Sequence, residues 1–144
     1  MPSHTADPRH THLVAVLPPL LTRSCPPRAG GFGGAWEVRL TRAETEDVGG
    51  LDLLRSAMRT AARSLGWTRV ETYGIATLYG AVAGIVDRRP VPEEFAAAIE
   101  RFREERMRAA VETVYRNRAD GRQRAVPGSV FVTTQEFRAA LAAR

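Results

Sequence analysis

Hydrophobic and polar positions change their period along the chain, and each period predicts one kind of element. In AWEVRLTR, which starts at Ala35, apolar and polar residues alternate, and this alternation predicts a strand with one buried face. In LDLLRSAMRTAARSLGW, from Leu51 to Trp67, apolar residues recur every third or fourth position. That spacing predicts an amphipathic helix, which Gly66 can end in the left-handed conformation.

The segments after this helix predict a hairpin and then a long helix. WTRVETYG and TLYGAVAGIVD have the pattern of two paired strands, although the Gly and Ala content of the second leaves a buried helix open as an alternative. The long helix is predicted from Pro92 to about Arg118, because Pro92 suits a first helical turn and Glu93 and Glu94 favour its positive end.

The end of the chain predicts one more strand and one more helix. SVFVT, residues 129–133, is typical of a short strand, and Thr133 with Glu136 has the capping-box spacing of a final helix. The first six elements are then ordered strand, helix, strand, strand, helix, strand. This order matches the ferredoxin-like arrangement. We therefore predict an α+β fold, a ferredoxin-like split βαββαβ sheet with an extra C-terminal helix.

The first 34 residues differ in composition from the rest. They hold six of the nine prolines, all three histidines and the only cysteine, and they end in AGGFGG. A Pro-rich segment without periodicity buries too little apolar surface to offset the entropy of ordering it. We expect a disordered Pro/Gly-rich tail at residues 1–34 and a single α+β domain at residues 35–144. A start codon further downstream is an alternative explanation of the tail.

Charge narrows the choice of partners. All 21 basic residues are arginine, and the formal net charge is +5. Arginine stays protonated and presents a planar fork suited to phosphate, so the chain favours anionic partners. The single cysteine, Cys25, excludes an internal disulfide and a cysteine-based zinc cluster, and a cytoplasmic location is expected. No apolar run approaches the ~20 residues of a membrane-spanning helix, so no membrane partner is expected.

Two groups of arginines are candidates for binding nucleic acid. Arg55, Arg59 and Arg63 fall on one row of the predicted helix, and no acidic residue follows within that helix to neutralise Arg59 or Arg63. A solvated surface and a phosphate-binding surface explain this row equally well. The second group flanks the loop ADGRQRAVPG, with only Asp120 to oppose it, and comprises Arg116, Arg118, Arg122 and Arg124.

Catalytic motifs are largely missing from the sequence. The domain predicted at residues 35–144 has neither histidine nor cysteine, which removes the commonest general base and the soft metal ligands. We therefore predict a non-enzymatic protein without metal or cofactor. A remote alternative comes from His10, His12 and Tyr115, which resemble the histidine pair and nucleophilic tyrosine of rolling-circle and relaxase-type nicking enzymes. Thr11 departs from that family, which has an apolar residue between the histidines.

The long helix suggests a different alternative. Its apolar stripe turns beyond Phe102, so that Met107, Val111 and Val114 lie about a quarter-turn round from the earlier positions. A helix of about 40 Å is also longer than a small sheet needs. These three residues are the candidate dimer interface of a homodimerising protein-interaction module that has no role with nucleic acid.

One further resemblance covers the middle of the chain. The run RSAMRTAARSLGWTRVETYG and the later DRRPVPEEF, within Asp52 to Phe95, are similar to small uncharacterised accessory proteins on plasmids and integrated elements of GC-rich bacteria. The resemblance implies no activity, but it favours a role near DNA. The leading hypothesis is an accessory protein that binds nucleic-acid phosphates through its arginines, in a salt-sensitive and sequence-tolerant way.

Overall fold

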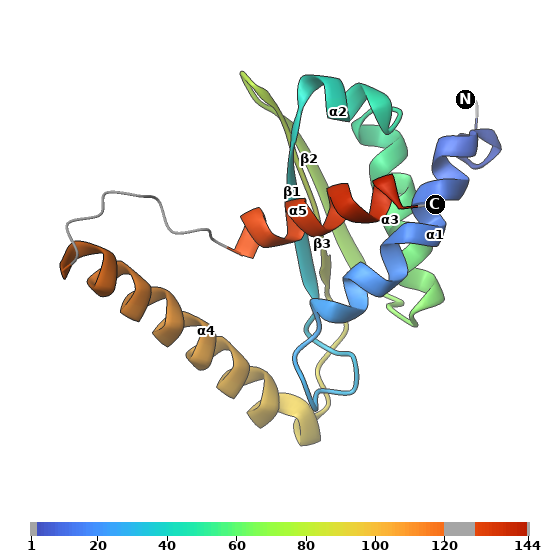
Figure 1. Cartoon of the computed structure of the whole chain (residues 1–144). Helices are drawn as coiled ribbons and strands as arrows, with labels where there is room; N and C mark the ends of the chain where they lie inside the picture. The colour runs from blue at the N-terminus through green and yellow to red at the C-terminus, as the bar shows by residue number, and fades with distance from the viewer. Residues whose placement is uncertain (1–2, 120–128, 144) are drawn as a thin grey trace.

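The computed structural model describes residues 3–119 and 129–143, and Figure 1 shows the arrangement of their elements. A small antiparallel sheet carries helices on one face, and one long helix extends away from this body. The elements in chain order are η1 (His4–Ala6), α1 (Pro8–Arg23), β1 (Ala35–Thr41), α2 (Arg42–Asp47), α3 (Leu51–Ser64), β2 (Val70–Ala76), β3 (Gly80–Asp87), α4 (Glu93–Ala119) and α5 (Ser129–Ala142).

The sheet contains three strands in the order β1-β3-β2, each antiparallel to its neighbour. Register places Trp36 opposite Ile85 and Val38 opposite Ala83, so one face of the sheet is apolar and buried. The small side chains of β3 leave room for α3 to pack closely across this face. The α+β class, the first strand, helix α3 and the hairpin are confirmed, whereas the short helix α2 between β1 and α3 was not predicted.

Helix α3 ends where its sequence predicts. Gly66 has a φ of +84°, and the Trp67 amide donates to the carbonyl of Ala62 at 3.0 Å. This is a glycine-terminated helix end, which satisfies carbonyls that the last turn leaves open. The chain then turns directly into β2, so the end of α3 lies beside the start of that strand.

The expectation of a disordered tail at residues 1–34 is wrong for most of this segment. Helix α1 runs through Pro18 and Pro19, and four of its leucines are buried in the common core, namely Leu13, Leu17, Leu20 and Leu21. They pack against α3, whose apolar stripe is wider than the narrow sheet can cover alone. The leucine spacing outweighs the two prolines, because burial of a leucine is worth about 2 kcal/mol.

The strand predicted at residues 129–133 is also wrong, because these residues form the first turns of α5. The Thr133 hydroxyl donates to the Glu37 carbonyl, and the Arg39 amide donates to the Thr134 hydroxyl at 3.0 Å. Two threonines therefore bond to two backbone groups on the outer edge of β1, where a ferredoxin-like sheet would add its fourth strand. Phe137 follows into the core, edge-on to Trp36 at 5.3 Å.

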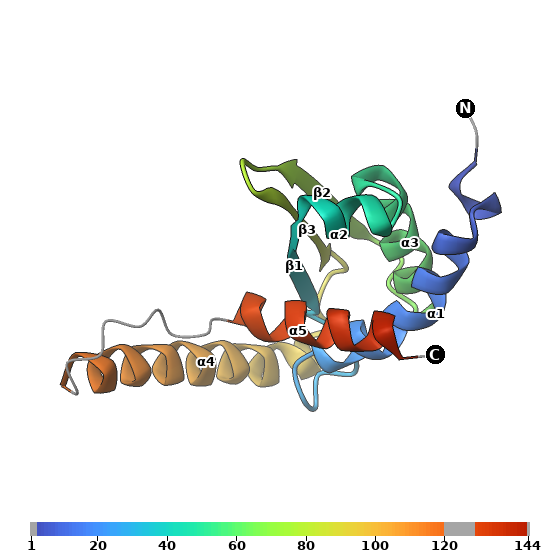
Figure 2. The ribbon, with the colours of Figure 1, turned by 45° about the horizontal axis from the view of Figure 1, so that its top comes forward.

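These differences set the fold apart from the predicted ferredoxin-like sheet. The described residues form three strands rather than four, and the second long helix, α4, does not cover the sheet. Figure 2 shows α4 extending past the sheet, with only its first turns near the body. The predicted capping box of Thr133 and Glu136 is likewise absent, since α5 already begins at Ser129 and Glu136 instead pairs with Arg23 at 3.0 Å.

Candidate nucleic-acid interface

A basic groove of about 490 Å³ lies between the end of α3 and the start of β2, and we call it the arginine groove. Four arginines and one carboxylate line it, which leaves an excess of three positive charges (four minus one). The larger cavity between α1, α2 and α5 instead has two arginines and two carboxylates in its lining. The lining residues are Arg59, Arg63, Trp67, Thr68, Arg69, Val70, Glu71 and Arg88.

The arginine row on α3 divides into two parts with different roles. Arg55 is half-buried and lies across β2, where its Nε donates to the Thr72 hydroxyl and its Nη2 to the Thr72 carbonyl, both at 3.3 Å. Arg59 donates to the same hydroxyl at 3.0 Å. Arg63 is exposed, with a single long bond of 3.5 Å to the Arg59 carbonyl. Arg55 therefore braces the helix on the sheet, while Arg59 and Arg63 line the groove.

The other two arginines lie at the open end of the hairpin, Arg69 just before β2 and Arg88 just after β3. The Arg88 amide donates to the Arg69 carbonyl at 2.8 Å, which continues the pairing of Val70 with Asp87 by one residue. Arg88 also pairs with the exposed Glu71 at 3.0 Å. An exposed pair of this kind contributes little, about 0–1 kcal/mol, so Arg88 can exchange Glu71 for a phosphate at small cost.

The floor of the groove is an aromatic ring that cannot reach a ligand. Trp67 is only 2% exposed and its indole packs against Gly34, where an added Cβ would lie 2.5 Å from the ring. Bases therefore have no aromatic surface here on which to stack. The groove offers guanidinium groups and little else, which suits the nucleic-acid backbone rather than the bases.

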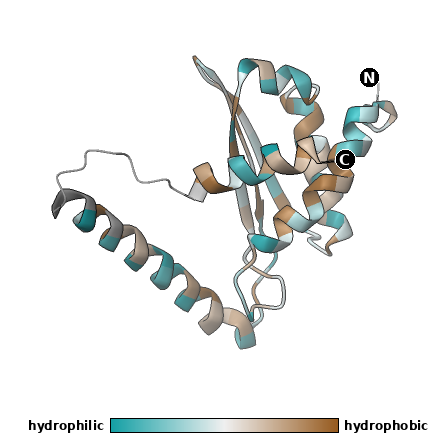
Figure 3. Cartoon of the chain, in the orientation of Figure 1, coloured by the Kyte–Doolittle hydropathy of each residue, from teal (hydrophilic) through white to brown (hydrophobic). Residues whose placement is uncertain are grey.

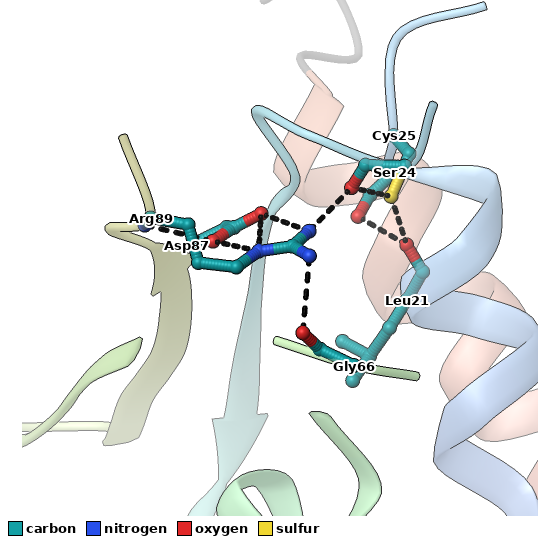
Figure 4. Close-up of polar contacts among 7 residues, drawn as sticks. Leu21, Ser24, Cys25, Gly66, Asp87 and Arg89 are labelled. Atoms are coloured by element: carbon teal, nitrogen blue, oxygen red, sulfur yellow. Dashed lines mark hydrogen bonds and ion pairs between the residues drawn. The ribbon is translucent and has the colours of Figure 1, made fainter. Parts of the chain in front are cut away.

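Asp87 and Arg89 form a buried ion pair close to the turn between α3 and β2, as Figure 4 shows. The Asp87 carboxylate accepts both a 3.0 Å and a 2.8 Å bond from Arg89, and the Asp87 side chain is 1% exposed. Arg89 extends further, donating to the carbonyls of Gly66 at 3.0 Å and Gly31 at 3.2 Å. It thus ties the end of β3 to the turn after α3 and to the loop before β1.

The cysteine beside this ion pair is not a reactive group. Burial and the nearby Asp87 carboxylate raise the pKa of the Cys25 thiol, against a smaller opposing effect of Arg89. The thiol also donates to backbone carbonyls, those of Leu21 at 3.5 Å and Gly31 at 3.4 Å. A thiol that stays protonated is a poor nucleophile, so Cys25 has a packing role.

Four arginines elsewhere in the described part of the chain are neutralised by carboxylates. The ion pairs outside the groove are Arg9 with Asp7, Arg23 with Glu136, Arg89 with Asp87 and Arg138 with Glu44. By contrast, Arg59, Arg63 and Arg69 make no ion pair among the described residues. The groove therefore gathers three arginines without an ion pair in one place.

The second predicted arginine group is only partly visible. Arg116 is exposed on α4, far from the groove (Figure 1). Arg122 and Arg124 lie outside the described residues, as does the side chain of Arg118. The structure therefore does not bring this group together with the groove, and its role in binding stays a prediction.

The residues of the nicking-enzyme alternative are not brought together. His10 is buried between α1 and α3, where its Nε2 lies 3.2 Å from the Ser56 hydroxyl. His12 on α1 and Tyr115 near the C-terminal end of α4 are both exposed. In both views that end of α4 lies on the opposite side of the molecule from α1 (Figures 1 and 2). No group of three possible metal ligands occurs among the described residues.

A larger cavity of about 850 Å³ lies between α1, α2 and α5. Its floor is apolar, formed by Leu13, Leu40 and Val48, and His12 stands at its rim. The charged groups at its edge are balanced, since Arg138 donates to both Glu44 oxygens at 2.6 and 2.9 Å. This balance leaves it without the positive excess of the arginine groove.

Sequence reasoning found half of the arginine groove. The helical row predicted Arg59 and Arg63, whereas Arg69 and Arg88 were not assigned to a site. The predicted hairpin contained the missing signal, because pairing its strands brings residue 69 opposite residue 88.

Comparison with known proteins does not extend this picture. No protein-family model matches the chain, and no curated protein or solved structure matches it either. None of the described helices combines the length and the apolar run that crossing a membrane requires.

Proposed function

We propose that this protein is a non-enzymatic accessory protein that binds the phosphate backbone of nucleic acid in the arginine groove. The observation that carries the proposal is the convergence of Arg59, Arg63, Arg69 and Arg88 on one groove that contains a single carboxylate. Guanidinium groups bind phosphate oxygens with paired, charge-assisted hydrogen bonds. Binding of this kind depends on charge and ignores base identity.

Preorganisation supports the proposal. Thr72 holds the Arg59 guanidinium, and the Asp87–Arg89 pair holds the turn between α3 and β2. Arginines fixed in advance lose less side-chain entropy when a phosphate arrives than free surface arginines do. The groove is therefore better suited to an anion than the α4 surface, where arginines alternate with glutamates.

The test is binding of fluorescently labelled single-stranded DNA, duplex DNA and RNA at low salt, followed by fluorescence anisotropy. The groove variant Arg59→Gln/Arg63→Gln/Arg69→Gln should bind at least tenfold more weakly than the wild type. Each of these side chains is exposed, so the fold should survive. The comparison of the three probes also tells whether DNA or RNA is preferred.

The control variant removes the same number of charges from other surfaces, as Arg9→Gln/Arg23→Gln/Arg42→Gln. These three arginines are exposed and lie outside the groove. The control should retain most of the wild-type affinity. If both variants lose affinity equally, net charge rather than the groove governs binding, and the proposal fails. Absence of binding by the wild type to all three probes would also refute it.

A further inference from the structure

Helix α4 extends away from the body of the molecule over most of its length (Figure 1). Only its first turns are anchored, where Phe95 stacks on Phe32 at 5.7 Å and Ile99 packs over Gly33. Figure 1 shows the rest of α4 well separated from the sheet and from α5. At ~1.5 Å per residue, its 27 residues extend about 40 Å. A helix with few tertiary contacts is only marginally stable in water, so we expect α4 to be stabilised by a partner.

An apolar seam follows the exposed part of the helix. Met107, Val111 and Val114 are 71%, 47% and 46% exposed. Their spacing of four and then three residues places them in one stripe, as in the a and d positions of a coiled coil. Figure 3 shows hydrophobic and hydrophilic positions mixed along α4. Such a stripe suits the face of another helix rather than a phosphate backbone.

The sequence has opposite charges at the two ends of this spacing. Glu100 and Glu104 continue the spacing toward the N-terminus, and position 118, an arginine, continues it toward the C-terminus. A second α4 placed parallel would set like charges against each other at both ends. An antiparallel α4 instead sets the acidic end of one helix against the basic end of the other. It also aligns the two helix dipoles favourably.

From this seam we infer that two copies of the chain pair through α4, antiparallel, with Met107, Val111 and Val114 at the centre of the contact. The apolar part is short compared with a standard interface, so the dimer is weak and forms in the micromolar range. Its twofold axis crosses α4 near Val111. The arginine grooves lie on the two bodies at the outer ends of the paired helices and stay open in the dimer.

Sedimentation velocity of the full chain, from low to high micromolar concentration, tests the pairing. The wild type should shift from monomer to dimer, and Val111→Glu should remain monomeric throughout. Since Val111 is exposed, circular dichroism should show the same thermal transition for both. The matched control is Leu78→Glu, which changes an exposed apolar residue of the hairpin turn, 77% exposed, and should dimerise normally. A monomeric wild type, or a dimer that Val111→Glu leaves intact, overturns the inference.

Charge reversal tests the orientation. Glu104→Arg should weaken the antiparallel dimer at least fivefold, because it sets two basic ends together. The double variant Glu104→Arg/Arg118→Glu should restore wild-type association, since the ends are then complementary again. In a parallel dimer Glu104 would face its own copy, and the second change would bring no rescue. Failure of the rescue would therefore contradict the antiparallel arrangement.

Discussion

The Glu44 carboxylate joins three elements. It accepts two bonds from Arg138 of α5, and it closes the capping box of α2 by accepting from the Thr41 amide at 3.0 Å. The Arg138 guanidinium is the main reason that the pKa of Glu44 falls from 4.5 to about 2. This residue links the C-terminal helix to the end of β1.

The lowered pKa of Glu44 predicts a specific loss of stability in acid. A carboxyl group with a depressed pKa in the folded state stabilises the fold above its unfolded value of 4.5, and that stabilisation disappears as the pH falls toward 2. Urea unfolding at about pH 6 and about pH 3 should therefore show a larger loss for the wild type than for Glu44→Gln. Equal losses in the two proteins would mean that the ion pair is not maintained in solution.

Because the ion pair of Asp87 and Arg89 is buried, we expect a conservative substitution of Asp87 to lower the stability of the fold strongly. Asp87→Asn keeps the shape of the side chain but leaves the guanidinium without its counter-charge. We expect a loss of about 3 kcal/mol in the free energy of unfolding, the usual cost of breaking a buried pair. Glu71→Gln is the control, since it breaks the exposed pair with Arg88 and should cost less than about 1 kcal/mol. Similar losses in the free energy of unfolding for the two variants would contradict a stabilising role of the buried Asp87–Arg89 pair.

At the scale of elements, substitutions in α1 test whether this helix belongs to the core. Leu17 is fully buried against α3, so Leu17→Ala should lower the free energy of unfolding by about 2–5 kcal/mol. Thr11→Ala changes an exposed residue of the same helix and should have little effect. If Leu17→Ala unfolds at the same denaturant concentration as the wild type, residues 8–23 are not part of the core.

The elements also show which parts of the fold the sequence could predict. β1, α3 and the hairpin have regular hydrophobic periods and ordinary turn residues, so the sequence pattern was sufficient to predict them. α1 was missed because Pro18 and Pro19 argue against a helix when its buried surface is unknown. SVFVT was assigned to a strand because its residues favour strands. In the fold these residues are helical, and α5 contacts the edge of β1 and places Phe137 in the core. Propensity is a weak guide where tertiary contacts decide.

The prediction of the candidate site was limited in the same way, because contacts between elements could not be read from the sequence. Helical periodicity alone put Arg59 and Arg63 on one surface, because they belong to one element. It also grouped Arg55 with them, although Thr72 draws that side chain onto the sheet. Arg69 and Arg88 join the groove only through the register of β2 with β3. Contacts between elements were what the sequence could not supply.

At the scale of the whole molecule, the two proposals assign different roles to two separate surfaces. The arginine groove lies between α3 and β2, while the apolar seam belongs to α4, which extends away from the body (Figure 1). A weak dimer would offer two grooves to one nucleic acid, and linked sites bind more tightly than either alone. Val111→Glu should therefore lower the apparent affinity for a long nucleic acid while leaving that for a short one unchanged. Equal effects on both lengths would contradict this division.

The dependence of nucleic-acid affinity on salt tests the central claim most directly. Each phosphate neutralised on duplex DNA contributes about −0.9 to the slope of log affinity against log salt. The wild type should give a steep slope, and Arg59→Gln/Arg63→Gln/Arg69→Gln should flatten it by about 2 to 3, one phosphate contact for each arginine. The charge-matched control, Arg9→Gln/Arg23→Gln/Arg42→Gln, should keep the wild-type slope. An unchanged slope in the groove variant would contradict the assignment of phosphate binding to the arginine groove.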